Sequence, residues 1–235
     1  MQRSERSLAV EIVRGAFAAL WLPFHSILRR STLSIGEKGQ SVRRARFDHA
    51  KWTLDLLKHL EWRRFEELCL AYFNAVGFAT STSRTRDDGV LDISLRAEGA
   101  QSAGLLAHCR AWNPYPIGLK PLQDLRAAMS AAGVAEGVLV SCGRFTQGAT
   151  EFAAKQGIDL IDGARLLGEL AALAPEKALA LLKLATKGDF LTPTCPACSI
   201  KMISRKSTGE GRAFWGCQNY PRCKQTFSST ANIPA

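Results

Sequence analysis

The chain has 235 residues, 46% of them hydrophobic, which is enough apolar material for a buried core and excludes wholesale disorder. A formal net charge of +10 and a pI near 9.5 favour an anionic partner, nucleic acid before membrane. Residues 1–50 carry nine Lys/Arg against four Asp/Glu, and residues 192–235 carry six against one, whereas residues 51–191 balance. We therefore expect a neutral globular centre between basic ends.

The N-terminal segment contains one membrane candidate, Leu8–Phe24. It has seventeen residues with Glu11 and Arg14 among them, and Pro23 stops any helix, whereas a span needs about twenty mostly apolar residues. We expect an amphipathic helix that packs on the core or touches a membrane surface, and no membrane span. Residues 30–50 are polar and basic, as in a linker. No secretory signal is visible, so the expected location is the cytoplasm.

From Leu54 onward the hydrophobic pattern is that of a folded domain. Apolar side chains at helical spacing predict a helix over 62–76, ended by Gly77. Further along we expect strands at 78–82, 90–95, 104–112, 137–141 and 158–161, and helices at 121–132, 146–156 (Thr146 as N-cap) and 164–187. The alternation of strand and helix predicts an α/β fold with at least one parallel strand pair.

The composition divides the chain into three parts: an N-terminal helix and basic linker (1–50), a globular domain (51–187), and a small C-terminal unit (188–235) that begins with a linker at 188–194. The C-terminal unit is expected to have a core separate from that of the globular domain. Cys69, Cys109 and Cys142 stand singly in apolar surroundings and are expected to be buried small hydrophobes.

Four cysteines cluster near the C-terminus: Cys195, Cys198, Cys217 and Cys223. A reducing cytoplasm favours metal binding over disulfides for such a cluster. Cys195 and Cys198 present two thiolates on a tight knuckle, and the chain up to Cys217 and Cys223 is long enough for a small hairpin to return and close a tetrahedral zinc site. Four cysteines leave no open position for water, so we predict one structural zinc ion. About forty residues bury too little apolar surface to fold unaided, and the metal can supply the missing stability.

Residues 62–167 resemble the catalytic domain of the Mrr-type restriction endonucleases, a branch of the PD-(D/E)XK nucleases. The resemblance rests on WRRFEELCLAYFNAVGF, DDGVLDISL, GLLAHCRAW and EGVLVSCGRFTQGATEFAAKQGIDLIDGARLL. It implies a restriction-endonuclease-like mixed sheet flanked by helices, and metal-dependent hydrolysis of DNA. Asp92 matches the carboxylate that anchors Mg²⁺ or Mn²⁺ in this family.

The family's next strand contributes an acidic or amide residue, one further residue, and a lysine, where this chain has His108-Cys109-Arg110. Arginine stays protonated, so Arg110 can clamp a phosphate but is a poor base. A neutral His108 could act as the base or bind a transition metal. Two alternatives follow: the site cuts DNA with altered chemistry, or it has lost catalysis and binds only.

Further carboxylates lie near these motifs. Glu66 and Glu67 could each supply a metal ligand or form a solvated acidic pair. Asp87 and Asp88 could also supply metal ligands, or they could simply form the turn before Gly89.

The C-terminal unit resembles the C4 zinc fingers of bacterial type IA topoisomerases, most clearly in Phe214-Trp215-Gly216-Cys217 and Tyr220-Pro221-Arg222-Cys223. This resemblance implies binding of single-stranded DNA, for which aromatic faces stack on bases and cations follow phosphates. Some of the aromatic residues are expected to fill the small core instead. The predicted DNA-binding residues are Lys201, Arg205, Lys206, Arg212, Trp215, Tyr220, Arg222 and Lys224.

Three functions are therefore open. The chain could be a DNA nuclease, a non-catalytic DNA-recognition module built on a degraded nuclease fold, or a protein whose zinc ribbon binds another protein. Target sequence and oligomeric state are left open, and a homo-oligomer is compatible with the sequence.

Overall fold

The computed structural model describes residues 51–83, 91–97, 100, 104–111, 116–207 and 213–228. The helix expected at 8–24, the linker at 30–50 and the acidic turn at Asp87-Asp88 lie outside these residues. Among the helices that the structure describes, none is long and apolar enough to cross a membrane.

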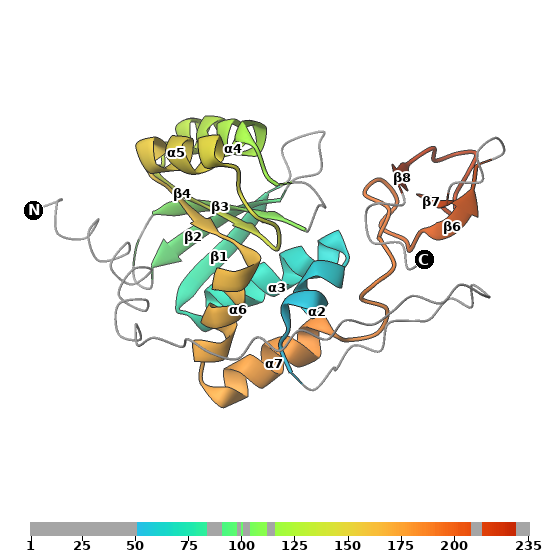
Figure 1. Cartoon of the computed structure of the whole chain (residues 1–235), viewed down its shortest axis with the longest axis horizontal. Helices are drawn as coiled ribbons and strands as arrows, with labels where there is room; N and C mark the ends of the chain where they lie inside the picture. Colours follow the sequence, from blue (N-terminus) through green and yellow to red (C-terminus); the bar gives the residue numbers. More distant parts are fainter. Residues whose placement is uncertain are drawn as a thin grey trace, which may run out of the picture. The chain divides into compact units, whose positions relative to one another are not determined.

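A five-stranded mixed sheet forms the centre of the globular domain, with its strands in sequence order (Figure 1). The strands are β1 (Phe78–Ser83), β2 (Asp92–Ala97), β3 (Leu105–Arg110), β4 (Glu136–Ser141) and β5 (Ile158–Ile161). The first three strands pair antiparallel, and β3 to β5 pair parallel. The α/β fold with a parallel pair, expected from the sequence, is confirmed.

Helices cover both faces of this sheet (Figure 1). Helices α4 (Leu119–Ala131) and α5 (Gln147–Gln156) lie on one face. The other face carries α3 (Trp62–Ala75) and α6 (Gly163–Ala172), with α2 (Leu54–His59) and α7 (Pro175–Ala185) packed outside them. A Cβ at Gly163 would lie 2.6 Å from the Cys142 carbonyl oxygen, so only glycine lets α6 start this close to the end of β4.

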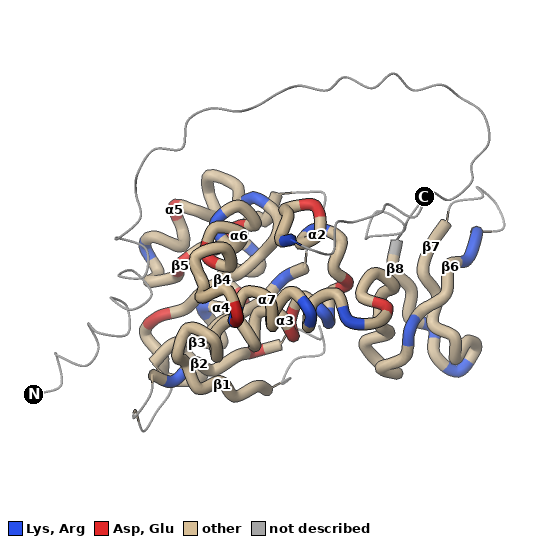
Figure 2. The backbone as a smooth tube through the Cα atoms, turned by 90° about the horizontal axis from the view of Figure 1, so that it is seen from below, with Lys and Arg blue, Asp and Glu red and all other residues tan. Residues whose placement is uncertain are grey.

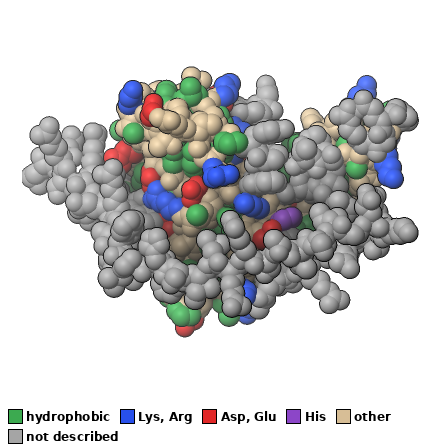
Figure 3. Space-filling view, viewed as in Figure 1, with side chains coloured by type: hydrophobic (Ala, Val, Ile, Leu, Met, Phe, Trp, Pro, Cys, Tyr) green, Lys and Arg blue, Asp and Glu red, His purple; other side chains and the backbone are tan. Residues whose placement is uncertain are grey.

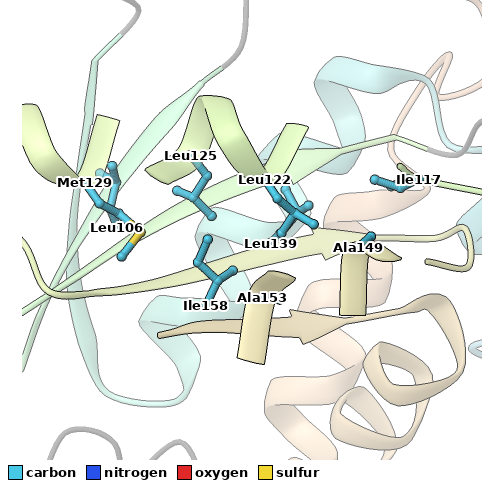
Figure 4. Close-up of a cluster of buried hydrophobic side chains, with 9 residues drawn as sticks. All are labelled: Leu106, Ile117, Leu122, Leu125, Met129, Leu139, Ala149, Ala153 and Ile158. Carbon is cyan, nitrogen blue, oxygen red and sulfur yellow. The ribbon is translucent and has the colours of Figure 1, made fainter. Parts of the chain in front are cut away.

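The α4–α5 face is held by an aliphatic cluster (Figure 4). Leu106 and Leu139 project from β3 and β4 against Leu122, Leu125 and Met129 of α4, as the alternation of side chains along a strand requires. Leu106 belongs to this face, so His108 and Arg110, two and four residues further along β3, point to the same side. The cluster therefore fixes the orientation of two predicted site residues.

A polar network joins the helices of the opposite face to the last strand. The Tyr72 hydroxyl on α3 donates to Glu169 on α6 at 2.6 Å, and Arg165 bonds both Glu169 and Asp159 of β5 at 2.7–2.9 Å. Burial raises the pKa of Glu169 despite these donors, which lower it. Because every member of this network is paired, it ties α3, α6 and β5 together.

Most elements agree with the sequence within two or three residues, and Thr146 caps α5 as expected, accepting from the Ala149 N–H at 3.2 Å. Two elements differ. The single helix expected at 164–187 is divided into α6 and α7, because Pro175 begins a new helix and cannot continue the old one. Helix α2, capped by the Thr53 hydroxyl, was not expected, since six residues are too few for a periodic signal.

Three short antiparallel strands form the C-terminal ribbon: β6 (Ile203–Lys206), β7 (Ala213–Gly216) and β8 (Thr226–Ser228). Its small core consists of Met202, Trp215 and the cysteines. The described ribbon residues, 192–207 and 213–228, include five Lys/Arg and no Asp or Glu, as Figure 2 lets the reader follow. On the face of the globular domain that Figure 3 presents, basic, acidic and apolar side chains are instead interspersed.

Candidate active site and metal centre

The antiparallel pairing of β2 and β3 brings two predicted site residues together. Asp92 lies directly opposite His108 in the register, so their side chains project on the same face. The distance from His108 Nε2 to Asp92 Oδ1 is 2.5 Å. His108 is 0% exposed and Asp92 7% exposed. The pair is therefore a short, buried hydrogen bond at the start of β2.

Arg110 follows on the same face of β3, at its C-terminal end. In the parallel pairing with β4 it lies opposite Ser141, whose buried hydroxyl accepts the Gly143 N–H at 3.0 Å. The Arg110 Nε is buried and has no hydrogen-bond partner among the described residues. The residue as a whole is half-buried, and the exposed part of its guanidinium is suited to an anionic oxygen from outside the chain.

The loops that follow β3 and β4 are joined at this end of the sheet. The Ile117 N–H donates to the Arg144 carbonyl at 2.8 Å, and the Thr146 N–H donates to the Ile117 carbonyl at 2.9 Å. These bonds place the segment before α5 beside Ile117, just before α4. The sequence analysis did not identify Ser141 as a residue of this site. The pattern that could have indicated it is a serine at the end of an apolar strand, directly before Cys142-Gly143.

The described donors at this site do not fit magnesium. Mg²⁺ prefers several oxygen ligands in octahedral geometry, and one oxygen of Asp92 is already bonded to His108. His108 offers nitrogen and Arg110 offers only donors. Among the described residues, no group of three potential metal ligands includes Asp92. The described residues therefore do not by themselves form a magnesium site.

The two glutamates considered as further ligands have other surroundings. Glu67 is 47% exposed and pairs with Arg63 and Arg64 at 4.0 and 3.5 Å, so it lies in a surface charge cluster. Glu66 is buried on α3, which packs on the sheet face opposite to that of His108. On that face α3 also buries Cys69 against Cys109, as expected for small apolar residues, and burial raises the Cys69 pKa.

The four clustered cysteines converge in the ribbon. Their Sγ atoms all lie within 4.8 Å of one another, and those of Cys195 and Cys223 are 3.7 Å apart. Zinc with Zn–S bonds of about 2.3 Å in a tetrahedron places sulfurs about 3.8 Å apart. Burial, together with hydrogen bonds to the neighbouring thiols, raises the pKa of Cys217 to about 12, so a thiolate at Cys217 needs a nearby cation. The donor set fits zinc.

Two tight turns present these thiols. In the first, the Cys195 N–H donates to the Ile200 carbonyl and the Ser199 N–H donates to the Cys195 carbonyl, both at 2.8 Å. In the second, the Asn219 N–H points at the Cys217 sulfur at 3.4 Å, which would stabilise negative charge on it. Zinc held by all four would be structural, since no coordination position remains for a reactant.

The structure separates the predicted DNA-binding residues into different settings. Trp215 is 7% exposed and lies in the ribbon core, as some aromatic residues were expected to do, whereas Tyr220 is 60% exposed. The Arg205 guanidinium lies over the Tyr220 ring, 5.5 Å from its centroid. Lys206, Arg222 and Lys224 are exposed. Arg212 lies outside the described residues.

Lys201 differs from the other basic residues of the ribbon because it is bonded within the chain. Its ammonium donates to Glu61 Oε1 at 3.2 Å and to the Thr192 carbonyl at 2.8 Å. Two such bonds leave it less available to a phosphate than the exposed Lys206 or Lys224.

Comparisons with known proteins agree with both resemblances. Residues 57–170 match the Mrr catalytic-domain family, described as restriction endonuclease, and residues 192–232 match the topoisomerase DNA binding C4 zinc finger family. A comparison with curated proteins found no match.

Two solved structures are similar to the chain. They are the DNA modification-dependent restriction endonuclease AspBHI (14% identity, TM-score 0.40, covering 65% of this chain and 43% of that one) and the MspJI restriction endonuclease in complex with a 27-mer oligonucleotide (20%, 0.39, 73% and 43%). The chain thus spans less than half the length of either protein. The globular domain thus resembles the Mrr-type restriction endonucleases over residues 57–170, and the C-terminal unit resembles the topoisomerase-type C4 zinc ribbons over residues 192–232.

Proposed function

We propose that this chain binds DNA through its restriction-endonuclease-like domain and its ribbon, and that it does so without magnesium-dependent cleavage. The buried bond between Asp92 and His108 carries this proposal. Hydrolysis of a phosphodiester needs a Lewis acid, an activated water and neutralisation of the developing charge. With Asp92 engaged by an imidazole and Arg110 in place of the lysine, the described residues supply only the last of these.

Arg110 and the ribbon provide the contacts of the proposed DNA complex. The half-buried guanidinium of Arg110 suits a backbone phosphate near the ends of β3 and β4. On the ribbon, Tyr220 offers a stacking face, and the exposed cations Lys206, Arg222 and Lys224 can follow the phosphates of a single strand. The zinc ribbon would then add affinity that depends on salt.

A second candidate is cleavage with a transition metal. It is favoured by the convergence of a carboxylate oxygen and an imidazole nitrogen at the same point of the sheet. Mixed oxygen and nitrogen donors suit Mn²⁺ or Zn²⁺ better than Mg²⁺. In this alternative His108 would turn from Asp92 to the metal, and Arg110 would neutralise charge on the phosphate.

The test measures cleavage and binding separately in wild type and Asp92→Asn. We expect supercoiled plasmid to remain intact with Mg²⁺ or Mn²⁺, while an oligonucleotide is bound equally with and without added divalent ions. Asp92→Asn should bind similarly, because its side chain can still meet His108. Nicking that requires Mn²⁺ and disappears in Asp92→Asn would instead establish the second candidate.

Replacing Tyr220 by alanine should weaken binding of single-stranded DNA by about 1–3 kcal/mol, the usual contribution of a base stacked on an aromatic ring. Fluorescence anisotropy with a labelled oligonucleotide at fixed salt measures the change. Ile203→Ala is the matched control, because Ile203 is an exposed apolar residue of the same ribbon without an aromatic face. Equal losses in both variants would rule out stacking at Tyr220.

A further inference from the structure

The residue before α3, Glu61, has a buried carboxylate that faces the ribbon. The side chain is almost fully buried, and its oxygens accept from the Arg63 N–H at 3.1 Å, the Thr194 N–H at 3.2 Å and the Thr194 hydroxyl at 3.0 Å. The Lys201 ammonium completes the set at 3.2 Å. Only the first of these bonds comes from the globular domain; the other three come from the ribbon.

Backbone contacts reinforce the same junction. The Glu61 N–H donates to the Phe190 carbonyl at 2.9 Å, and the Trp62 indole donates to the Thr194 carbonyl at 2.7 Å. Phe190 and Thr194 are buried, although the sequence had suggested a plain linker at 188–194. The ribbon core is therefore bonded to the first turn of α3, not merely tethered to the domain.

Both ribbon residues that bind Glu61 flank the first metal-binding turn. Thr194 and Lys201 form an isolated antiparallel bridge, and the Cys195–Ile200 backbone bond lies directly inside it. The ligands Cys195 and Cys198 sit within this closed loop. A metal ion that fixes these two sulfurs therefore also fixes Thr194 and Lys201, which donate hydrogen bonds to Glu61.

We propose that Glu61 couples zinc occupancy of the ribbon to the stability of the restriction-endonuclease-like domain. Without the metal, a ribbon this small loses its main source of stability, and Thr194 and Lys201 leave their positions. The carboxylate then loses three of its four hydrogen bonds, and the first turn of α3 loses its attachment to residues 190–194. Coupling between two sites is reciprocal, so loss of Glu61 must also weaken zinc binding, although Glu61 is not itself one of the four candidate ligands.

The zinc affinity of the full chain tests this reciprocity. A competition titration against a chromophoric chelator should give a dissociation constant about 5- to 150-fold weaker for Glu61→Ala than for wild type, the usual range of such couplings. Glu67→Ala is the matched control, since Glu67 lies on α3, which Glu61 caps, and pairs with Arg63 and Arg64 at the surface. Its zinc affinity should equal that of wild type.

Hydrogen exchange provides a second measurement that does not depend on Glu61→Ala being folded. The Phe65 amide, bonded to the Glu61 carbonyl at 3.0 Å, should exchange faster when the wild-type chain is stripped of zinc. If Glu61→Ala does not fold, Lys201→Met, which removes one bond to Glu61, is compared with Lys224→Met. Equal zinc affinities within each pair, or Phe65 exchange unchanged by zinc removal, would overturn the proposal.

Discussion

Replacing Cys217 by serine is expected to remove zinc from the chain and to unfold the ribbon. The Cys217 sulfur is buried among the other three ligands, and a serine hydroxyl is a hard, largely protonated group that zinc binds poorly. Binding of structural zinc contributes about 10–16 kcal/mol in comparable peptides, more than a unit this small can recover by burying apolar surface. Metal analysis should find about one zinc per wild-type chain and almost none in Cys217→Ser.

A matched control separates this effect from loss of any buried cysteine. Cys142 is buried too, but its thiol donates to the Leu57 carbonyl at 3.2 Å, a bond that serine can also make. Cys142→Ser should retain its zinc. Wild-type protein that carries no zinc after purification without chelators would contradict the assignment of the metal centre.

Restoring the family's residues at the altered strand is expected to produce magnesium-dependent cleavage. In the double variant His108→Glu with Arg110→Lys, a carboxylate replaces the imidazole that engages Asp92, so oxygen ligands become available to Mg²⁺. A lysine beside a metal can lose its proton near neutral pH, which arginine cannot do. General-base catalysis contributes about 10²–10⁴-fold, and plasmid nicking should rise by at least about 10²-fold over wild type.

The control is the same double variant with Asp92→Ala, which should be inactive because the anchoring carboxylate is gone. Equal inactivity of wild type and double variant over a range of Mg²⁺ and Mn²⁺ concentrations would mean that the pocket has diverged beyond these two residues. Robust cleavage by wild type that Arg110→Ala abolishes would show that guanidinium suffices, and would refute the proposed loss of catalysis.

Local patterns allowed most of the fold to be predicted. Helix α3 follows from its periodic apolar residues and from Gly77, whose positive φ ends a helix through backbone sterics alone. Pro175 is an equally local signal that 164–187 forms two helices, but the sequence analysis predicted a single helix there. Helix α2 could not be found this way, since its stability comes from packing two buried leucines against the rest of the domain.

The sequence by itself determined the four metal-ligand candidates and the family that each domain resembles, because cysteine spacing and motif residues are properties of the chain order. Only the tertiary structure decided how these residues are used. Strand register brings His108 onto Asp92, sixteen residues away, and packing buries Trp215 while exposing Tyr220. Packing also buries Glu61 against Thr194, 133 residues further along. Such contacts depend on the burial and hydrogen bonding of distant groups, which no local pattern encodes.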